Sequence, residues 1–281
     1  MTAFTAACIQ MRSGRSVADN IAQAEGLIRE AAAKGAHYVQ TPEMTNILER
    51  TRADLFAKIT DEAGDPTLAR FRALAQDLGI WLHAGSLAIR LDGEQVANRA
   101  FLIAPDGGVR ARYDKIHMFD VDLPNGESWR ESATYRPGTQ SVVADLPWLR
   151  MGLAVCYDVR FPAIFRSQAR QGAQMLTMPA AFTRQTGQAH WHVLQRSRAI
   201  ENGAFVVSAA QGGRHEDGRE TYGHSLIVGP WGEVLAEADH DEPGIALAEI
   251  RPEEAAAARQ RIPAIANERD FVLARAEEAL P

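Results

Sequence analysis

The chain has 281 residues, a mass of 30.8 kDa and a formal net charge of −6, from 36 acidic residues against 30 lysines and arginines. This acidic balance argues against nucleic acid as a partner. No apolar run approaches the roughly 20 residues that a membrane-spanning helix needs, so no membrane partner is expected. Two cysteines are too few for a disulfide scaffold and no signal peptide is recognisable, which together favour a cytoplasmic location.

The first part of the chain alternates strand and helix patterns. Apolar clusters predict the strands, and apolar residues at helical spacing predict helices that end at Gly35 and Gly79. In chain order we expect a strand at Phe4–Gln10, a helix at Val17–Lys34, a strand at His37–Thr41, a helix at Thr67–Leu78 and a strand at Ile80–Ile89. The turn Pro105-Asp106-Gly107-Gly108 predicts a hairpin of Arg99–Ala104 with Val109–Tyr113.

A polar segment, Phe119–Thr139, is then expected to be a long loop, and loops of this length are often functional. Strands and helices alternate again after it, and the last third is mostly strands. The expected segments are strands at Val142–Ala144 and Met151–Val155, a helix at Phe161–Gln171, a strand at Met175–Met178, a helix at Gln188–Glu201, strands at Phe205–Ala210, Ser225–Val228, Val234–Glu237 and Ile245–Ile250, and a helix at Glu253–Gln260 before an irregular tail.

This order favours an α/β fold in which helices cover sheets whose strands are buried on both faces. A four-layer α-β-β-α sandwich satisfies the pattern, and the absence of repeats and linkers predicts one domain over residues 1–281. A Rossmann fold fits less well because no Gly-x-Gly-x-x-Gly follows the first strand, where Met11–Arg15 lies instead. We therefore expect no nucleotide cofactor.

Three residues that follow predicted strands are candidates for chemistry. Cys156 follows an apolar strand and precedes a turn, which would expose the thiol near backbone N–H groups, although a small buried hydrophobe fits the local pattern equally well. Glu43 follows a strand and a proline, and Lys115 follows the hairpin; alone, each would usually be a solvated side chain. Cys8 lies inside the first strand and is expected in the core.

Other patterns give weaker signals. His190 and His192 are two residues apart, so a helix would point them to different faces, and no metal-ligand motif accompanies them. We therefore expect no metal site. Ser208 and Ser225 lack the Gly-x-Ser-x-Gly elbow of the α/β-hydrolases.

Three segments together resemble the signature segments of the nitrilase superfamily of carbon-nitrogen hydrolases, in that family's order and at its usual separations. They are Thr41-Pro42-Glu43, Tyr113-Asp114-Lys115-Ile116-His117, and the segment from Gly152 to Pro162, Gly-Leu-Ala-Val-Cys-Tyr-Asp-Val-Arg-Phe-Pro. The likeness continues through Ala189-His190-Trp191, Arg198-Ala-Ile-Glu201-Asn202, Tyr222-Gly223-His224-Ser225 and Pro230-Trp231-Gly232. It therefore covers nearly the whole chain.

The resemblance implies an α-β-β-α sandwich that usually pairs into dimers, with a catalytic set of Glu43, Lys115 and Cys156 and a second glutamate at Glu131. A thiol needs a base to become a nucleophile, which Glu43 would supply. Lys115 and the backbone N–H of Tyr157 would form the oxyanion hole, and Glu131 would keep Lys115 charged. A small amide would be the substrate, and a homodimer is expected.

Cys156-Tyr157-Asp158-Val159-Arg160-Phe161-Pro162 looks like the branch that holds the deaminated-glutathione amidases and omega-amidases, which remove ammonia from amides bearing a carboxylate. Ala209 to His215 and Tyr222 to Ser225 look more like the former. Arg160, Arg184 and His190 are candidates for binding the substrate carboxylate, because they lie near the site segments in sequence. Alternatives are an acyltransferase that uses the same thioester and a binding protein without activity, although the latter should have lost a catalytic residue.

The sequence departs from its relatives in three places. Ala163 stands where relatives often have Glu, Gly212 replaces a cysteine, and Gln40-Thr41 is more polar than the usual strand before Pro-Glu. None of these positions belongs to the expected catalytic set, so we expect activity to be retained.

Overall fold

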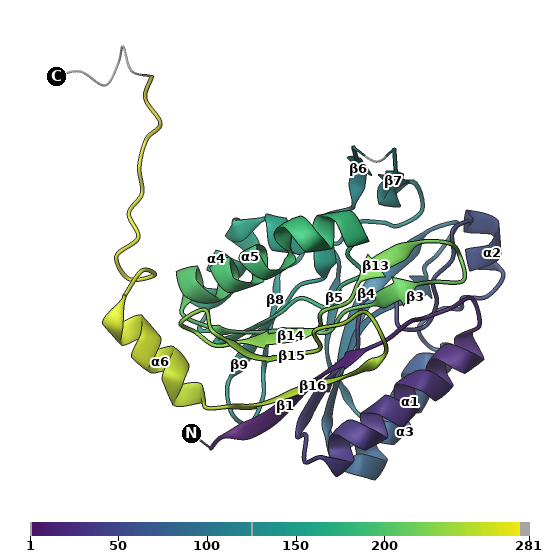
Figure 1. The fold of residues 1–281 in the computed structure, drawn as a ribbon, viewed down its shortest axis with the longest axis horizontal. Helices are drawn as coiled ribbons and strands as arrows, with labels where there is room; N and C mark the ends of the chain where they lie inside the picture. The colour runs from purple at the N-terminus through teal and green to yellow at the C-terminus, as the bar shows by residue number, and fades with distance from the viewer. Residues whose placement is uncertain (1, 125, 276–281) are drawn as a thin grey trace.

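Two six-stranded sheets face each other at the centre of the molecule (Figure 1). The computed structural model describes residues 2–124 and 126–275. The first sheet has the order β16-β1-β2-β3-β4-β5 and contains β1 (Phe4–Gln10), β2 (Tyr38–Gln40), β3 (Trp81–Arg90), β4 (Val96–Ile103), β5 (Val109–Asp114) and β16 (Gly244–Ile250). The second has the order β15-β14-β11-β10-β9-β8 and contains β8 (Val142–Asp145), β9 (Arg150–Leu153), β10 (Met175–Thr177), β11 (Phe205–Ser208), β14 (Leu226–Val228) and β15 (Val234–Glu237).

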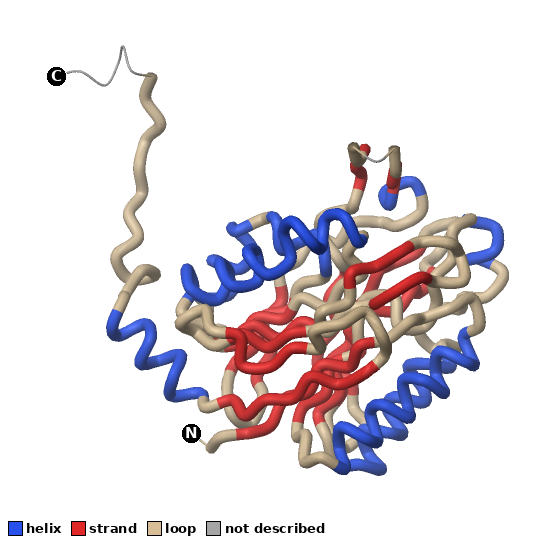
Figure 2. The backbone as a smooth tube through the Cα atoms, viewed as in Figure 1, coloured by secondary structure: helices blue, strands red, loops and turns tan. Residues whose placement is uncertain are grey.

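Helices cover the outer face of each sheet (Figure 2). On the first sheet lie α1 (Val17–Ala33) and α3 (Pro66–Leu78), and on the second lie α4 (Pro162–Arg170) and α5 (Arg184–Asn202). Strand β1 shows why both faces are apolar, because successive side chains point to opposite faces. Ala6 and Cys8 pack between the sheets, whereas Ala7 and Ile9 pack under the helices. The predicted α-β-β-α sandwich is thus confirmed, and Cys8 is a core residue.

The predicted helix ends follow from local chemistry. Asp65 caps α3 by accepting a hydrogen bond from the Leu68 amide at 2.7 Å, and Gly79 ends that helix in the left-handed conformation. Helix α5 starts at Arg184, four residues before the predicted Gln188, because the Thr183 side chain accepts from the Thr186 amide. The polar first turn of this helix carries no apolar stripe, so periodicity alone did not reveal it.

Several short elements were not predicted. The expected loop at Phe119–Thr139 contains a hairpin of β6 (Asp120–Asp122) and β7 (Ser128–Arg130) and a 3₁₀ turn at Glu131–Ala133. Other additions are α2 (Arg52–Phe56) and the ribbon of β12 (Gly212–Arg214) with β13 (Glu220–Tyr222). Helix α6 (Pro252–Arg261) matches its prediction, Glu268 beyond it forms an ion pair with Arg170 of α4, and the described chain then extends away from the body of the molecule (Figure 1). In the part of the chain that is described, no helix is long and apolar enough to cross a membrane.

A buried polar network links the two sheets and explains the polarity of strand β2. Gln40 Oε1 accepts from the Ala209 amide of the opposite sheet at 2.7 Å, while Gln40 Nε2 lies 3.1 Å from His83 Nδ1. Tyr38 Oη lies 2.8 Å from the same nitrogen. Burial lowers the pKa of His83 to about 3, so the imidazole is neutral and can accept from both neighbours.

Candidate active site

The three residues singled out at strand ends come together in one pocket of about 310 Å³. Glu43 follows β2, Lys115 follows β5, and Cys156 follows β9. The first two belong to one sheet and the third to the other, so packing of the sheets face to face brings them together. All three side chains are nearly buried, with relative exposures of 4%, 2% and 6%. Ligands of α/β sheets bind beyond the carboxyl ends of strands, and this pocket has that position.

Lys115 lies between two carboxylates. Its Nζ donates to Glu43 Oε1 at 2.9 Å and to both oxygens of Glu131, at 3.0 and 2.8 Å. Burial alone would lower the pKa of Lys115, but the Glu131 and Glu43 carboxylates outweigh it and raise that pKa well above its usual range. The two carboxylates therefore favour the charged ammonium. It also takes the place between the carboxylates that a metal ion would need, so these donors do not fit a metal centre.

Asn98 was missed in the sequence. It lies on β4, and its Nδ2 donates to Glu43 Oε1 at 2.9 Å and to Glu131 Oε1 at 3.1 Å. The Lys115 amide in turn donates to the Asn98 carbonyl at 3.0 Å. Asn98 thus helps to position both glutamates beside the lysine. The only signal in the sequence was a polar residue in an apolar strand, and the predicted strand began one residue too late to include it.

Cys156 stands at a strained turn. It is the first residue of the 3₁₀ helix η2 (Cys156–Arg160), and its φ of 51° is in the left-handed region that side chains other than glycine rarely adopt. Its amide donates to the Pro179 carbonyl at 2.9 Å. The turn places Cys156 in the lining of the same pocket as Glu43.

Electrostatics keep this thiol protonated at rest. Burial raises the pKa of the Cys156 thiol well above its usual range and the Glu43 carboxylate raises it further, while Lys115 acts in the opposite direction. A thiol becomes a strong nucleophile only as the thiolate. A buried thiol of this kind would need a proton acceptor in order to attack, and the Glu43 carboxylate lines the same pocket.

Asp158 is a second residue that sequence reasoning missed. Fully buried, it accepts from the Val155 amide at 2.9 Å and from Tyr113 Oη at 2.6 Å. Its other oxygen lies 2.6 Å from His117 Nδ1. Asp158 therefore connects the turn at Cys156 to Tyr113 and His117, which lie two residues before and two residues after Lys115. These contacts hold Cys156 and Lys115 in a fixed relative position.

A close backbone approach fixes the loop that carries Glu43. Gly85 on β3 lies so near this loop that a Cβ there would come within 1.9 Å of the Thr41 carbonyl and 2.7 Å of the Pro42 carbonyl. The Ala181 amide then donates to Glu43 Oε2 at 2.9 Å from the opposite sheet. These contacts set the orientation of the carboxylate.

Of the predicted oxyanion-hole and substrate-binding residues, some line the pocket and others lie outside it. Tyr157 and Arg160 line the pocket, and the Tyr157 amide makes no backbone hydrogen bond among the described residues. His190 does not line the pocket, but its Nδ1 lies 3.3 Å from the Arg160 guanidinium. Arg184 lies outside the lining and forms an ion pair with Asp241 at 2.8 Å.

One further pocket residue carries an available positive charge. Arg50 lies in the loop just before α2, and its guanidinium lies 5.9 Å from the ring centroid of Trp129 on β7. Neither Arg50 nor Arg160 has a carboxylate partner among the described residues, whereas Arg219, also in the lining, is paired with Asp217 at 2.6 Å. Two guanidiniums are therefore free to bind an anionic ligand.

Comparison with known proteins identifies the family. Residues 5–260 match the family model described as carbon-nitrogen hydrolase. The chain is 39% identical over 274 residues to the deaminated glutathione amidase of Synechocystis, covering 94% of this chain and 98% of that protein. It is 36% identical to omega-amidase NIT2 of Homo sapiens, covering 98% of both.

A solved structure agrees with this result. The NitFhit protein of C. elegans superposes with a TM-score of 0.88 at 34% identity, over 95% of this chain and 65% of that longer one. The chain belongs to the carbon-nitrogen hydrolase family of the nitrilase superfamily and is a hydrolase of carbon-nitrogen bonds other than peptide bonds.

Proposed function

We propose that the protein is a deaminated-glutathione amidase, which hydrolyses the amide of a small carboxylate-bearing substrate to carboxylate and ammonia. The observation that carries the proposal is that Cys156, Glu43 and Lys115 line one pocket, with Lys115 hydrogen-bonded to Glu43, and that this pocket also holds two unpaired arginines. The similarity to the Synechocystis enzyme supports the choice of substrate.

In the first half of the reaction, the Cys156 Sγ attacks the amide carbonyl carbon and Glu43 accepts the thiol proton. A tetrahedral oxyanion forms and is stabilised by the Lys115 ammonium and the Tyr157 amide. Removing one such donor typically costs about 10²–10³ in rate. Glu43 then returns its proton to the amide nitrogen, the C–N bond breaks, ammonia leaves, and a thioester remains on Cys156.

In the second half, water attacks the thioester. Glu43, again a carboxylate, removes a proton from that water, and the same donors stabilise the second oxyanion. When the intermediate collapses, the C–S bond breaks, the acid product leaves, and the proton held by Glu43 returns to the sulfur. Glu131 takes no proton: it orients Lys115 and keeps it charged.

The substrate carboxylate is assigned to Arg160 and Arg50. A guanidinium can bind a carboxylate through two parallel hydrogen bonds. The His190 contact orients Arg160 from outside the pocket. Replacing Arg160 with alanine should therefore raise KM more than it lowers kcat, because binding to this group is the same in the ground state and the transition state.

The direct test is ammonia release from a panel of deaminated glutathione, alpha-ketoglutaramate, simple aliphatic amides, a nitrile and an N-carbamoyl amino acid. Wild type and Cys156→Ala are compared on each. A preference for deaminated glutathione that disappears in the variant supports the proposal. A higher kcat/KM on any uncharged amide would overturn it.

An omega-amidase acting on alpha-ketoglutaramate is the second candidate, favoured by the similarity to the human enzyme. Both candidates predict a Cys156 thioester, so the panel alone separates them. An acyltransferase would form the same thioester but pass the acyl group to an amine. Product analysis with an added amine acceptor distinguishes transfer from hydrolysis.

We also propose the cytoplasm as the location of the enzyme. Both cysteines are free and buried, as expected for a protein that matures in a reducing compartment. Fractionation of expressing cells, with the amidase activity followed in each fraction, tests this assignment.

A further inference from the structure

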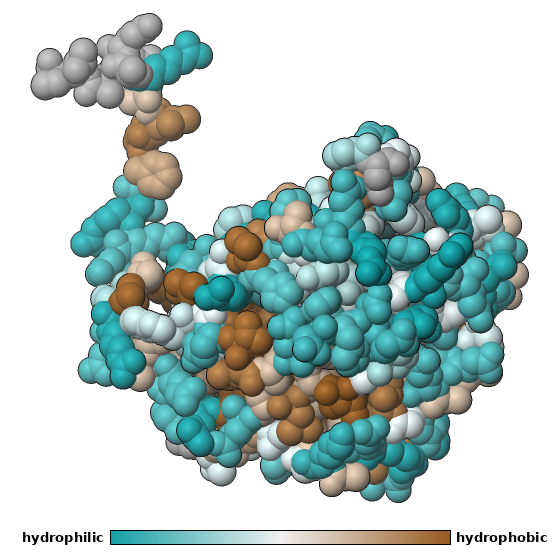
Figure 3. Space-filling view, in the orientation of Figure 1, coloured by the Kyte–Doolittle hydropathy of each residue, from teal (hydrophilic) through white to brown (hydrophobic). Residues whose placement is uncertain are grey.

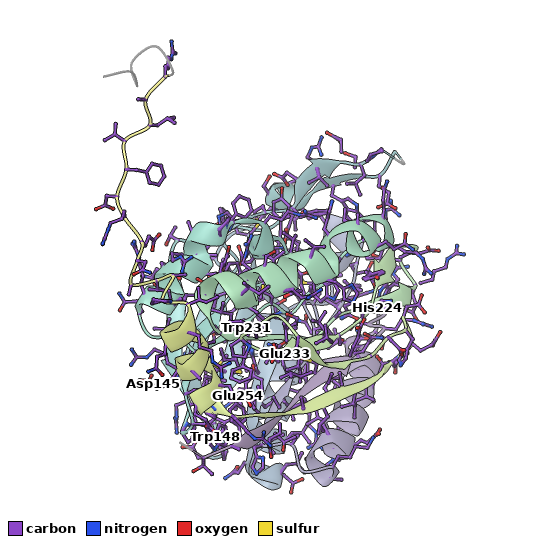
Figure 4. All side chains as sticks on the ribbon, turned by 60° about the vertical axis from the view of Figure 1, so that its left-hand side comes forward. Asp145, Trp148, His224, Trp231, Glu233 and Glu254 are labelled. Carbon is purple, nitrogen blue, oxygen red and sulfur yellow. The ribbon has the colours of Figure 1, made fainter. Side chains whose placement is uncertain are left out.

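Three potential metal ligands converge outside the pocket, on the face of the molecule that carries α5. His192 lies on α5, His224 lies just before β14, and Glu237 is the last residue of β15. Figure 4 shows His224 beside the long helix α5. Glu237 Oε1 lies 2.8 Å from His192 Nε2 and 2.8 Å from His224 Nδ1. All three ligand atoms lie within 4.8 Å of one another.

The surrounding residues hold this arrangement in place. His224 adopts a φ of 56°, a backbone conformation that non-glycine residues rarely adopt. Its carbonyl accepts from Trp191 Nε1 at 2.7 Å, and its ring stacks on Tyr222 with 4.1 Å between centroids. Backbone strain of this kind persists only where the surroundings enforce it. Here the enforced conformation aims the imidazole at Glu237.

The side chains are also accessible and suitably charged. Their exposures of 33%, 21% and 22%, for His192, His224 and Glu237, leave room for an ion to enter from solvent. The Glu237 carboxylate accepts a hydrogen bond from each of the two imidazoles, so it faces both histidines. The cluster thus offers one anionic oxygen and two imidazole nitrogens.

We propose that His192, His224 and Glu237 form a binding site for one zinc ion, with solvent as the fourth ligand. Two imidazoles and a carboxylate are a common zinc ligand set, with ligand distances of about 2.0–2.2 Å. Tetrahedral geometry at those distances places the ligand atoms roughly 3.3 Å apart. The two 2.8 Å contacts would lengthen by a few tenths of an ångström as zinc replaces the two hydrogen bonds, and the two imidazole nitrogens, which lie within 4.8 Å of each other, would close on the ion.

The bound ion would connect α5, β15 and the segment before β14. The three ligands come from separate elements, and the sequence pattern of one element does not indicate where the others lie. The spacing of the ligands in the sequence therefore could not predict the metal site. The proposal does not depend on the amidase reaction, because none of the three ligands lines the pocket.

The test measures zinc binding to the untagged Cys156→Ser protein, in which the catalytic thiol cannot act as a ligand. Competition with a chromogenic chelator gives the stoichiometry and Kd, and cobalt(II) in place of zinc reports coordination by its visible absorption. We expect one ion per chain, a rise in the thermal unfolding midpoint with zinc, and no competition from excess magnesium, which prefers oxygen ligands.

Variants assign the ligands. His224→Ala and Glu237→Gln should each weaken zinc binding by at least about tenfold, since loss of even an indirect partner of a metal ligand costs that much. His192→Ala, on the surface of a helix, provides a third ligand variant if His224→Ala does not fold. His190→Gln is the matched control, because His190 lies two positions before His192 on another face of α5 and should leave the Kd unchanged. Absence of stoichiometric binding, or equal binding by all variants, would refute the site.

Discussion

At the scale of single residues, the environment of Cys156 is expected to affect the reactivity of the resting thiol and the rate of turnover in opposite directions. The thiol is held protonated by burial and by the Glu43 carboxylate, while Lys115 favours the thiolate. Glu43 therefore disfavours the resting thiolate, and in the proposed reaction it is also the base. A variant that removes only its charge tests both roles.

Glu43→Gln should lower kcat by about 10²–10⁴, the usual contribution of a general base. Because the raising effect of the carboxylate is lost and Lys115 remains, the pKa of Cys156 should fall. The pH at which iodoacetamide alkylation reaches half its maximal rate should therefore move to a lower value in the variant. Alkylation rates across pH, with the modified cysteine identified by mass spectrometry, measure this shift.

Two controls accompany the experiment. Cys8 is fully buried in the core and should stay unmodified. Glu220→Gln removes a different pocket carboxylate, which has no ion pair among the described residues, and should leave both alkylation and turnover near wild type. If the alkylation midpoint of Glu43→Gln moved to a higher pH, the assigned electrostatic role of Glu43 would be wrong.

The proposed catalytic residues could be picked out in the sequence, but the residues that support them could not. Glu43, Lys115 and Cys156 stand in distinctive segments at the ends of predicted strands. Asn98 and Asp158 act through contacts to residues 55 and 41 positions away in the chain, with no local pattern that marks them. Arg184 and His190 show the converse, because closeness in sequence to the site segments did not place them in the pocket.

At the scale of elements, the site depends on how closely the loop after β2 approaches strand β3. Gly85→Ala should force the two apart, because the new Cβ would overlap the Thr41 carbonyl, and Pro179 of the opposite sheet leaves no room on its other side. We expect a loss of about 1–3 kcal/mol in the free energy of unfolding, as for other overpacked cores. We also expect a fall in kcat, because Glu43 moves with its loop. Denaturant unfolding and steady-state kinetics measure the two effects.

Gly26→Ala is the control for this substitution. Gly26 lies within α1, and a Cβ there meets nothing within 4 Å. The change should increase stability by about 0.5–1 kcal/mol, since alanine is the better helix former, and leave kcat unaltered. Gly85→Ala with wild-type kcat would show that the close approach does not position Glu43.

Long elements were predictable because their apolar periodicity is strong, as in α1 and α3. Short polar elements were not. Strands β6 and β7 have three residues each and are mostly exposed, so they carry no apolar alternation. Yet this hairpin supplies Trp129 and Arg130 to the pocket wall, so part of the pocket comes from the segment that sequence patterns describe least well.

At the scale of the whole molecule, large exposed apolar side chains gather on one face. Figure 3 shows apolar side chains gathered over β14 and β15 and the neighbouring part of α5. The large exposed apolar residues of these elements are Val193, Ile200, Trp231, Val234 and Leu235. Contiguous exposed patches of this kind usually mark interfaces. We propose that this face, the α5–β15 face, is the interface of a homodimer.

The interface predicts a particle of twice the 30.8 kDa chain mass. Ile200→Asp would place a charge in the centre of this face, where α5 packs against the β14–β15 turn, and a buried unpaired charge strongly opposes association. The variant should therefore be monomeric in size-exclusion chromatography with light scattering. Phe271→Asp, which changes an exposed apolar residue of the C-terminal segment, is the matched control and should remain dimeric.

The two proposals share this face, because His192 contacts Glu237 at the end of β15, the strand that carries Val234 and Leu235, but they can be separated. If zinc and dimerisation are independent, Ile200→Asp should bind one ion per chain with the wild-type Kd, and His224→Ala should remain dimeric. Light scattering of both variants, with and without zinc, gives the answer. A monomeric wild type would refute the interface while leaving the zinc site untouched, whereas loss of zinc binding in a folded monomeric Ile200→Asp would mean that the partner completes the metal site.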